Sequence, residues 1–211
     1  MADSFDPISW GSYMKTRFLH VGREFGHHVL CGTPIVDIET TQNIKTLGRD
    51  DYKKTDICCV GIIVDDQIIQ IHREPRTNDI TQFKIETTSH MKHHRNVHAF
   101  NRHFEYYGLT NYLGIDSLSV EEIKPFHGKG WTKDKFFDEL TKDGIIKGQM
   151  PVDPFHGDAT LVFNSWANGD IKSILDHNVV CLLKEYYILK NRDYLYNKHR
   201  HKIDAGGWYR P

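Results

Sequence analysis

The sequence predicts an α/β domain in which helices flank a mixed β-sheet, and the order of its apolar segments carries this prediction. Short apolar runs typical of strands fill the first half of the chain, whereas long segments with helical spacing fill the second half. Between them, a short strand-like run alternates with helical segments. Strands followed by such an alternation are typical of layered α/β folds.

The first three predicted strands lie close together in the chain. Residues 35–39 form a short run with apolar residues at both 36 and 38, which favours a buried strand. The runs 57–64 and 67–72 are separated only by Asp65-Asp66, two turn-forming residues, and therefore predict a β-hairpin. Because the two strands of a hairpin are antiparallel, the sheet cannot be parallel throughout.

Helices and one or two further strands are predicted after the hairpin. A capping-box pair, Ser119 with Glu122, predicts a helix from about residue 119. Residues 108–116 predict a glycine turn and a short strand, and Asn101 fits the N-cap of a helix. The remaining expected elements are a helix at 79–94, a strand at 96–100, a helix start at 101–107, and helices at 132–142, 158–167 and 171–191.

A length of 211 residues suits one domain with additions at both ends. Residues 1–32 are interpreted as a lead-in with some helical content that packs on the core, and residues 192–211 as a basic, aromatic tail. The domain itself is expected over residues 33–191, and it includes a long, partly ordered insertion at 126–157 of the kind that often carries function.

Composition excludes several classes of protein. With 39% hydrophobic residues and 11 Phe and 10 Tyr, the chain can build a core and is not disordered as a whole. No stretch approaches 18 consecutive apolar residues, and the first residues lack an apolar secretory segment, so neither a membrane span nor secretion is expected. The cysteines, at 31, 58, 59 and 181, form no CxxC pair, which fits free thiols in a cytoplasmic or other reducing compartment.

The charge distribution limits any nucleic-acid site to a local patch. The formal net charge is −1, so the strongly basic surface of many nucleic-acid-binding proteins is absent. Two local clusters of basic residues remain, one at 84–103 and one in the tail from Arg192. Either cluster could be a solvated face or a contact for a phosphate backbone.

The strongest chemical signal is a pair of carboxylates in the first predicted strand, Asp37 and Glu39. Side chains alternate along a strand, so these two project from the same face. Repulsion and desolvation make such a pair costly inside a sheet, and a divalent cation removes this cost. Oxygen ligands suit Mg²⁺ or Mn²⁺. The alternative is an edge strand with a solvated face.

This motif, IVDIETT, resembles the first motif of the DEDD 3′–5′ exonucleases of the ribonuclease H-like superfamily, in which a DxE pair on the first strand holds the catalytic metals. The segment 98–105 is similar to the family's second motif, with Asn101 and Phe104 in place but Glu105 where the family usually has Asp. The segment 166–178 resembles the last helix of the family. The resemblance implies a ribonuclease H-like mixed sheet flanked by helices over residues 33–191.

The third motif lacks the carboxylate that the resemblance requires. Counting four positions from His177 leads to Cys181, and an alternative register leads to Asn178. Cys181 is a soft ligand that suits Zn²⁺ better than Mg²⁺, and Asn178 offers only a neutral carbonyl. A His177/Cys181 pair at helical spacing could also bind a soft metal, or His177 could simply pack on a helix face.

The resemblance implies a metal-dependent 3′–5′ exonuclease that acts on DNA or RNA, with single-stranded substrate preferred. Asp37, Glu39 and Glu105 would bind Mg²⁺ or Mn²⁺, and His177 would position or activate the attacking water. Four further residues are candidates for contact with nucleic acid through local structure, charge or stacking: Asn101, Lys129, Trp131 and Arg200.

Two other classes of function remain open. The incomplete third motif favours a catalytically inactive nuclease fold that binds nucleic acid or a protein partner. The histidines at 90, 93, 94 and 98 raise a third possibility, a histidine-rich metal-binding or scaffold protein. We interpret those histidines as solvated, because no Glu lies between a pair of them as zinc proteases require.

Overall fold

The computed structural model describes residues 14–26, 32–42, 55–75, 80–146 and 150–204. It confirms an α/β fold with a mixed sheet, whose six strands lie in the order β1-β4-β3-β2-β5-β6. The strands are β1 Met14–His20, β2 Ile35–Thr40, β3 Ile57–Val64, β4 Gln67–Arg73, β5 Asn96–Ala99 and β6 Ser119–Glu122. Cys31 and the predicted lead-in and tail residues 1–13 and 205–211 lie outside the described residues.

Strand β2 joins the two halves of the sheet. Strands β1, β4, β3 and β2 pair antiparallel, whereas β2, β5 and β6 pair parallel. Ile35 of β2 is the register partner of both Ile63 in β3 and His98 in β5. Because β2 is central and helices cover both faces, each of its six residues is buried.

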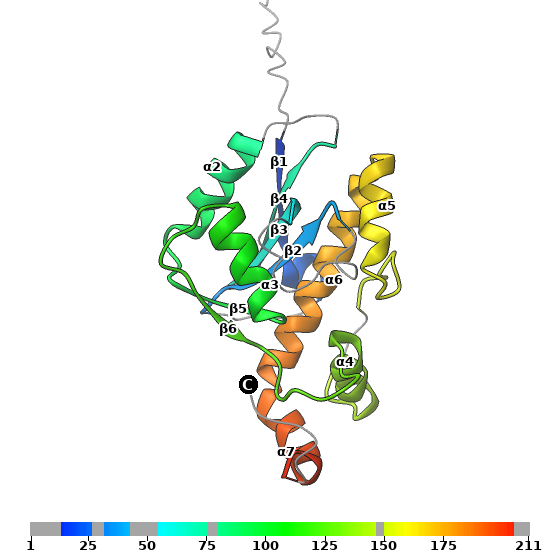
Figure 1. Ribbon diagram of the computed structural model, residues 1–211. Coiled ribbons are helices and arrows are strands. Elements are labelled where there is room, and N and C mark those ends of the chain that lie inside the picture. Colours follow the sequence, from blue (N-terminus) through cyan, green and yellow to red (C-terminus); the bar gives the residue numbers. More distant parts are fainter. Residues whose placement is uncertain (1–13, 27–31, 43–54, 76–79, 147–149, 205–211) are drawn as a thin grey trace, which may run out of the picture.

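The helices form one layer on each face of the sheet. They are α1 Val21–Phe25, α2 Ile80–Met91, α3 Arg102–Tyr107, the π-helix η3 Gly108–Tyr112, α4 Lys133–Lys142, α5 Thr160–Asn168, α6 Ile171–Lys190 and α7 Arg192–Lys202. Figure 1 shows α2 and α3 on one side of the sheet, and α5 and α6 on the other. No helix in these described ranges is both long and apolar enough to cross a membrane.

The alternation of side chains along β2 decides which layer its carboxylates meet. Val36 and Ile38 belong to the core that contains Phe104 of α3, while Ile35 belongs to the core that contains Leu182 of α6. Asp37 shares a face with Ile35, because side chains two positions apart point the same way. The acidic pair therefore projects toward the α6 layer.

Two predicted elements after α3 are wrong. Residues 119–122 form the edge strand β6 rather than a capped helix. Val120 is buried between exposed Ser119 and Glu121, as in a strand, and the backbone of the segment pairs in parallel with β5. The capping-box pattern depends only on neighbouring residues and therefore gives no information about pairing with a distant strand. Residues 108–112 form a π-helix that continues α3, where we expected a turn and a strand.

The two additions to the domain pack on it. In the lead-in, residues 14–20 form β1, an edge strand antiparallel to β4, where only helical content was expected; such pairing depends on a partner that local periodicity does not show. In the tail, Leu195 of α7 and Ile203, which follows α7 directly, lie in the same core as α6. Both ends of the described chain therefore stabilise the sheet–helix sandwich.

Candidate metal centre

Four buried carboxyl groups, from β2, α3 and α6, gather around Asp37 of β2. Asp37 and Glu39 are 6% and 5% exposed, Glu105 of α3 is 3% exposed, and Glu185 of α6 is fully buried. Glu105 lies within electrostatic range of both Asp37 and Glu185. Three elements that are far apart in the sequence thus build one acidic centre, which we call the carboxylate centre (Asp37, Glu39, Glu105 and Glu185).

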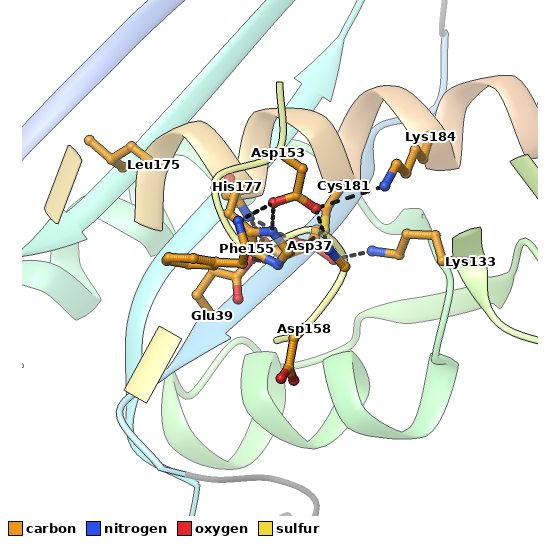
Figure 2. A network of polar contacts seen from close by, with 12 residues as sticks. Asp37, Glu39, Lys133, Asp153, Phe155, Asp158, Leu175, His177, Cys181 and Lys184 are labelled. Atoms are coloured by element: carbon orange, nitrogen blue, oxygen red, sulfur yellow. Dashed lines mark hydrogen bonds and ion pairs between the residues drawn. The ribbon is translucent and has the colours of Figure 1, made fainter. Parts of the chain in front are cut away.

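The ammonium of Lys133 lies inside the carboxylate centre. Its Nζ is 2.8 Å from Asp37 Oδ1 and 2.5 Å from Glu185 Oε1, and Figure 2 shows the side chain reaching Asp37. Lys133 is the first residue of α4, whose N-cap Thr132 accepts a hydrogen bond from the Lys135 amide. The cap fixes the start of the helix, and thereby directs Lys133 toward the sheet.

Asn178 holds the other oxygen of Asp37. Asn178 Nδ2 donates to Asp37 Oδ2 at 2.9 Å, and Asn178 Oδ1 accepts from Gln70 Nε2 at 3.0 Å. Both polar atoms of Asn178 are therefore engaged, and the residue positions Asp37 instead of offering a ligand oxygen. Gly61 makes this approach possible, since a Cβ there would lie 2.0 Å from Asn178 Oδ1.

His177 and Cys181 line the other side of Glu39. His177 Nδ1 is 2.8 Å from Asp153 Oδ1, and its Nε2 is 3.5 Å from Cys181 Sγ and 3.9 Å from Glu39 Oε1. Figure 2 shows Asp153 beside the imidazole. Asp153 is itself held by the backbone amides of Phe155 and Gly157, each at 2.9 Å. The ring of His177 is thus fixed with Nε2 directed toward Cys181 and Glu39.

Burial separates the protonation states of the four carboxyl groups. It raises the pKa of Glu39 and of Glu185 well above the ordinary range, and raises the pKa of Glu105 to about 8. Burial acts in the same direction on Asp37, but the ammonium of Lys133 outweighs it and the pKa of Asp37 lies below its ordinary value. Without a metal, Asp37 is therefore the member of the centre that ionises most readily, and Lys133 balances its charge.

A second charge pair involves His177. Burial works against the charged imidazole, but the carboxylates of Glu39 and Asp153 outweigh it and raise the pKa of His177. Burial likewise works against the Asp153 carboxylate, but its bond to His177 lowers the pKa of Asp153. His177 therefore favours the protonated form, which can donate a proton but cannot accept one.

The carboxylate centre has the donor atoms that Mg²⁺ or Mn²⁺ requires. Oxygens of three of its members make no hydrogen bond with any described residue, namely Glu39 Oε1, Glu105 Oε2 and Glu185 Oε2, whereas Glu185 Oε1 pairs with Lys133. Buried polar atoms without partners are rare in folded proteins, and a bound cation is one explanation for them. The fit requires Lys133 to withdraw and the protonated carboxyl groups to release their protons.

The structure brings together the four residues predicted as catalytic, Asp37, Glu39, Glu105 and His177. Sequence reasoning missed Glu185, Lys133 and Asp153. Glu185 follows Cys181 by four residues on α6, so helical spacing alone could have identified it as a carboxylate on the face of the third motif. No local pattern marks Lys133 or Asp153, because both lie in the insertion and reach the centre only through the tertiary fold.

The structure describes all four residues predicted to contact nucleic acid. Asn101 occupies the N-cap position of α3 without a side-chain capping bond. Lys129 is exposed, and the Arg200 side chain is 68% exposed, with its Nε 3.5 Å from Asp204. Trp131 is half-buried, because its ring packs 4.7 Å from His199 and also against Phe126 and Phe136. The ring of Trp131 thus ties the insertion to α7.

The fold and the centre define an α/β protein with a buried acidic site that includes one histidine and one lysine. No protein-family model, no curated protein and no solved structure matches the chain.

Proposed function

We propose that the protein is a metal-dependent nuclease of ribonuclease H-like architecture that hydrolyses phosphodiester bonds of DNA or RNA, as a 3′–5′ exonuclease on single strands. One observation carries the proposal: the carboxyl groups of Asp37 and Glu185 both contact the Lys133 ammonium, and the buried carboxyl group of Glu105 lies within its electrostatic range. A hairpin followed by parallel strands, with a DxE pair on the central strand, supports the architecture.

Each residue of the centre has a role in this proposal. Asp37, Glu39 and Glu105 hold Mg²⁺ or Mn²⁺, and Glu185 supplies the carboxylate that the third motif lacks. The bound ions would generate hydroxide and stabilise charge on the phosphate. Asn178 fixes Asp37 through its amide, and Asp153 fixes the ring of His177. Protonated His177 serves as a donor toward a phosphate oxygen or an ordered water.

A specific observation favours a second candidate function. Lys133 already supplies positive charge at the carboxylates, and Cys181 stands where the resemblance requires an aspartate. If Lys133 never withdraws, the domain is a catalytically inactive nuclease fold that binds nucleic acid or a protein partner. Buried free thiols at Cys58, Cys59 and Cys181 agree with the proposal of a cytoplasmic or other reducing compartment.

A nuclease assay separates the two candidates. We expect the purified protein with Mn²⁺ or Mg²⁺ to shorten end-labelled single-stranded DNA or RNA stepwise from the 3′ end. Asp37→Asn keeps the shape of the side chain but removes its charge, so it should abolish cleavage. Asp138→Asn is the matched control, because Asp138 is an exposed carboxylate on α4 that is not a member of the carboxylate centre, and it should keep the wild-type rate.

Two results would reject the nuclease. Cleavage that persists in Asp37→Asn would come from another site or a contaminant. Absence of cleavage by folded wild-type protein, with either metal and either substrate, would favour the inactive module.

A further inference from the structure

A donor set of different chemistry adjoins the carboxylate centre. The ligand atoms of Glu39, His177 and Cys181 all lie within 4.8 Å of one another, and all three residues are buried. Within the described ranges this is the only group of three or more His, Cys, Asp or Glu residues with such spacing. It combines one oxygen, one imidazole nitrogen and one sulfur, whereas the carboxylate centre offers oxygen alone.

The distances in this set approach those of a tetrahedral zinc site. Zn–S and Zn–N bonds of about 2.3 and 2.0–2.1 Å at a tetrahedral angle put sulfur and nitrogen about 3.6 Å apart. Cys181 Sγ lies 3.5 Å from His177 Nε2. Nitrogen and oxygen ligands would be about 3.4 Å apart, and His177 Nε2 lies 3.9 Å from Glu39 Oε1. Cys181 Sγ lies within 4.8 Å of the Glu39 carboxylate, against about 3.6 Å in such a site. A movement of this carboxylate toward both partners is therefore needed to complete the geometry.

Two further observations point to a ligand in this position. Glu39 Oε1 is buried, has no hydrogen-bond partner among the described residues, and faces His177. Asp153 accepts a hydrogen bond from His177 Nδ1, which leaves Nε2 for a metal. A carboxylate behind a ligating histidine is the usual way in which proteins orient an imidazole toward zinc.

We propose that Glu39, His177 and Cys181 bind Zn²⁺, with a fourth position left for water, and that Asp153 positions His177. A thiolate and an imidazole select Zn²⁺ over Mg²⁺, which prefers oxygen ligands alone. The site shares Glu39 with the carboxylate centre, and bound Zn²⁺ would replace the proton that gives His177 its donor role above, so the site is tested independently of nuclease activity. It explains why a cysteine, rather than a carboxylate, occupies position 181 on α6.

Cobalt substitution tests the site directly. Metal-stripped, reduced protein titrated with Co²⁺ should develop a thiolate-to-cobalt charge-transfer band that saturates at one equivalent and disappears when Zn²⁺ is added. Cys181→Ala should lose the band. Cys59→Ala is the matched control, because Cys59 is also buried and is the register partner of Glu39 on β3, and it should keep the band.

The orienting role of Asp153 has its own readout. Asp153→Asn should weaken Zn²⁺ binding by about 10- to 100-fold while the charge-transfer band is kept at saturating Co²⁺. Circular dichroism of each variant checks that it folds. A wild-type protein without the band, a band that survives in Cys181→Ala, or a band that depends on Cys59 would overturn the proposal. None of these outcomes decides the nuclease assay, which reports on Asp37.

Discussion

Replacing Lys133 with methionine is expected to destabilise the metal-free protein by about 3–5 kcal/mol at neutral pH, because it leaves a buried carboxylate without its partner. Methionine keeps most of the aliphatic volume, so the change removes mainly the charge. The Asp37 side chain is 8% exposed and that of Glu185 is fully buried, so solvent cannot replace the ammonium. Urea denaturation of both proteins measures the difference.

The pH dependence of this loss identifies its cause. Lys133 holds the pKa of Asp37 below its ordinary value of 3.8, so the stabilisation is present above that value and disappears as the pH falls through the lower, folded-state pKa. In Lys133→Met, Asp37 takes up a proton more readily, so the deficit should shrink as the pH is lowered from 7 toward 4.

Lys172→Met is the matched control for this variant. The Lys172 side chain is 84% exposed, and its partner Asp176 is 30% exposed. A pair that water can solvate should make the loss about 1 kcal/mol or less. Equal losses in the two variants, or a Lys133 deficit that is the same at pH 4 and pH 7, would show that Lys133 does not neutralise a buried carboxylate.

The second large effect is expected at Gly61, where we predict that alanine destabilises the protein by about 3 kcal/mol or more. The new Cβ would lie 2.0 Å from Asn178 Oδ1 and 2.8 Å from Leu182 Cδ1. Asn178 would have to move, and its hydrogen bonds with Asp37 and Gln70 would be lost inside the core. The variant therefore combines overpacking with unsatisfied buried polar groups.

Gly32→Ala controls for the general effect of replacing a glycine. Nothing lies within 4 Å of a Cβ at Gly32, and its φ is outside the left-handed region, so stability should change by about 0.5 kcal/mol or less. Denaturant midpoints for both variants make the comparison. Wild-type stability in Gly61→Ala would mean that Asn178 does not press against β3.

The sequence predicts the central part of this fold because the pattern there is local. The apolar run of β3 and β4 with Asp65-Asp66 between them specifies a hairpin by itself. The DxE pair on β2 indicates that Asp37 and Glu39 belong to one site, because side chains two positions apart in a strand point to the same face.

The missed parts depend on contacts between distant segments. Strands β1 and β6 form because they pair with the edges of β4 and β5. The sequence immediately around β1 or β6 does not show that such an edge is available. Lys133 lies 96 residues from Asp37 in the chain, and Asp153 lies 24 residues from His177. Side chains of this kind reach a site only when the layers pack, so neither spacing nor residue type marks them beforehand.

Uptake of Mn²⁺, followed by the loss of the free-ion signal in electron paramagnetic resonance, tests most directly whether the carboxylate centre exchanges the Lys133 ammonium for a divalent cation. Binding requires ionised carboxylates, and the pKa of Glu105 is about 8, so the affinity should rise from pH 7 to pH 9. We expect saturable uptake by the wild type, tighter uptake by Lys133→Met, and none by Asp37→Asn. Absence of uptake by both wild type and Lys133→Met at pH 9, or equal uptake by Asp37→Asn, would contradict this exchange.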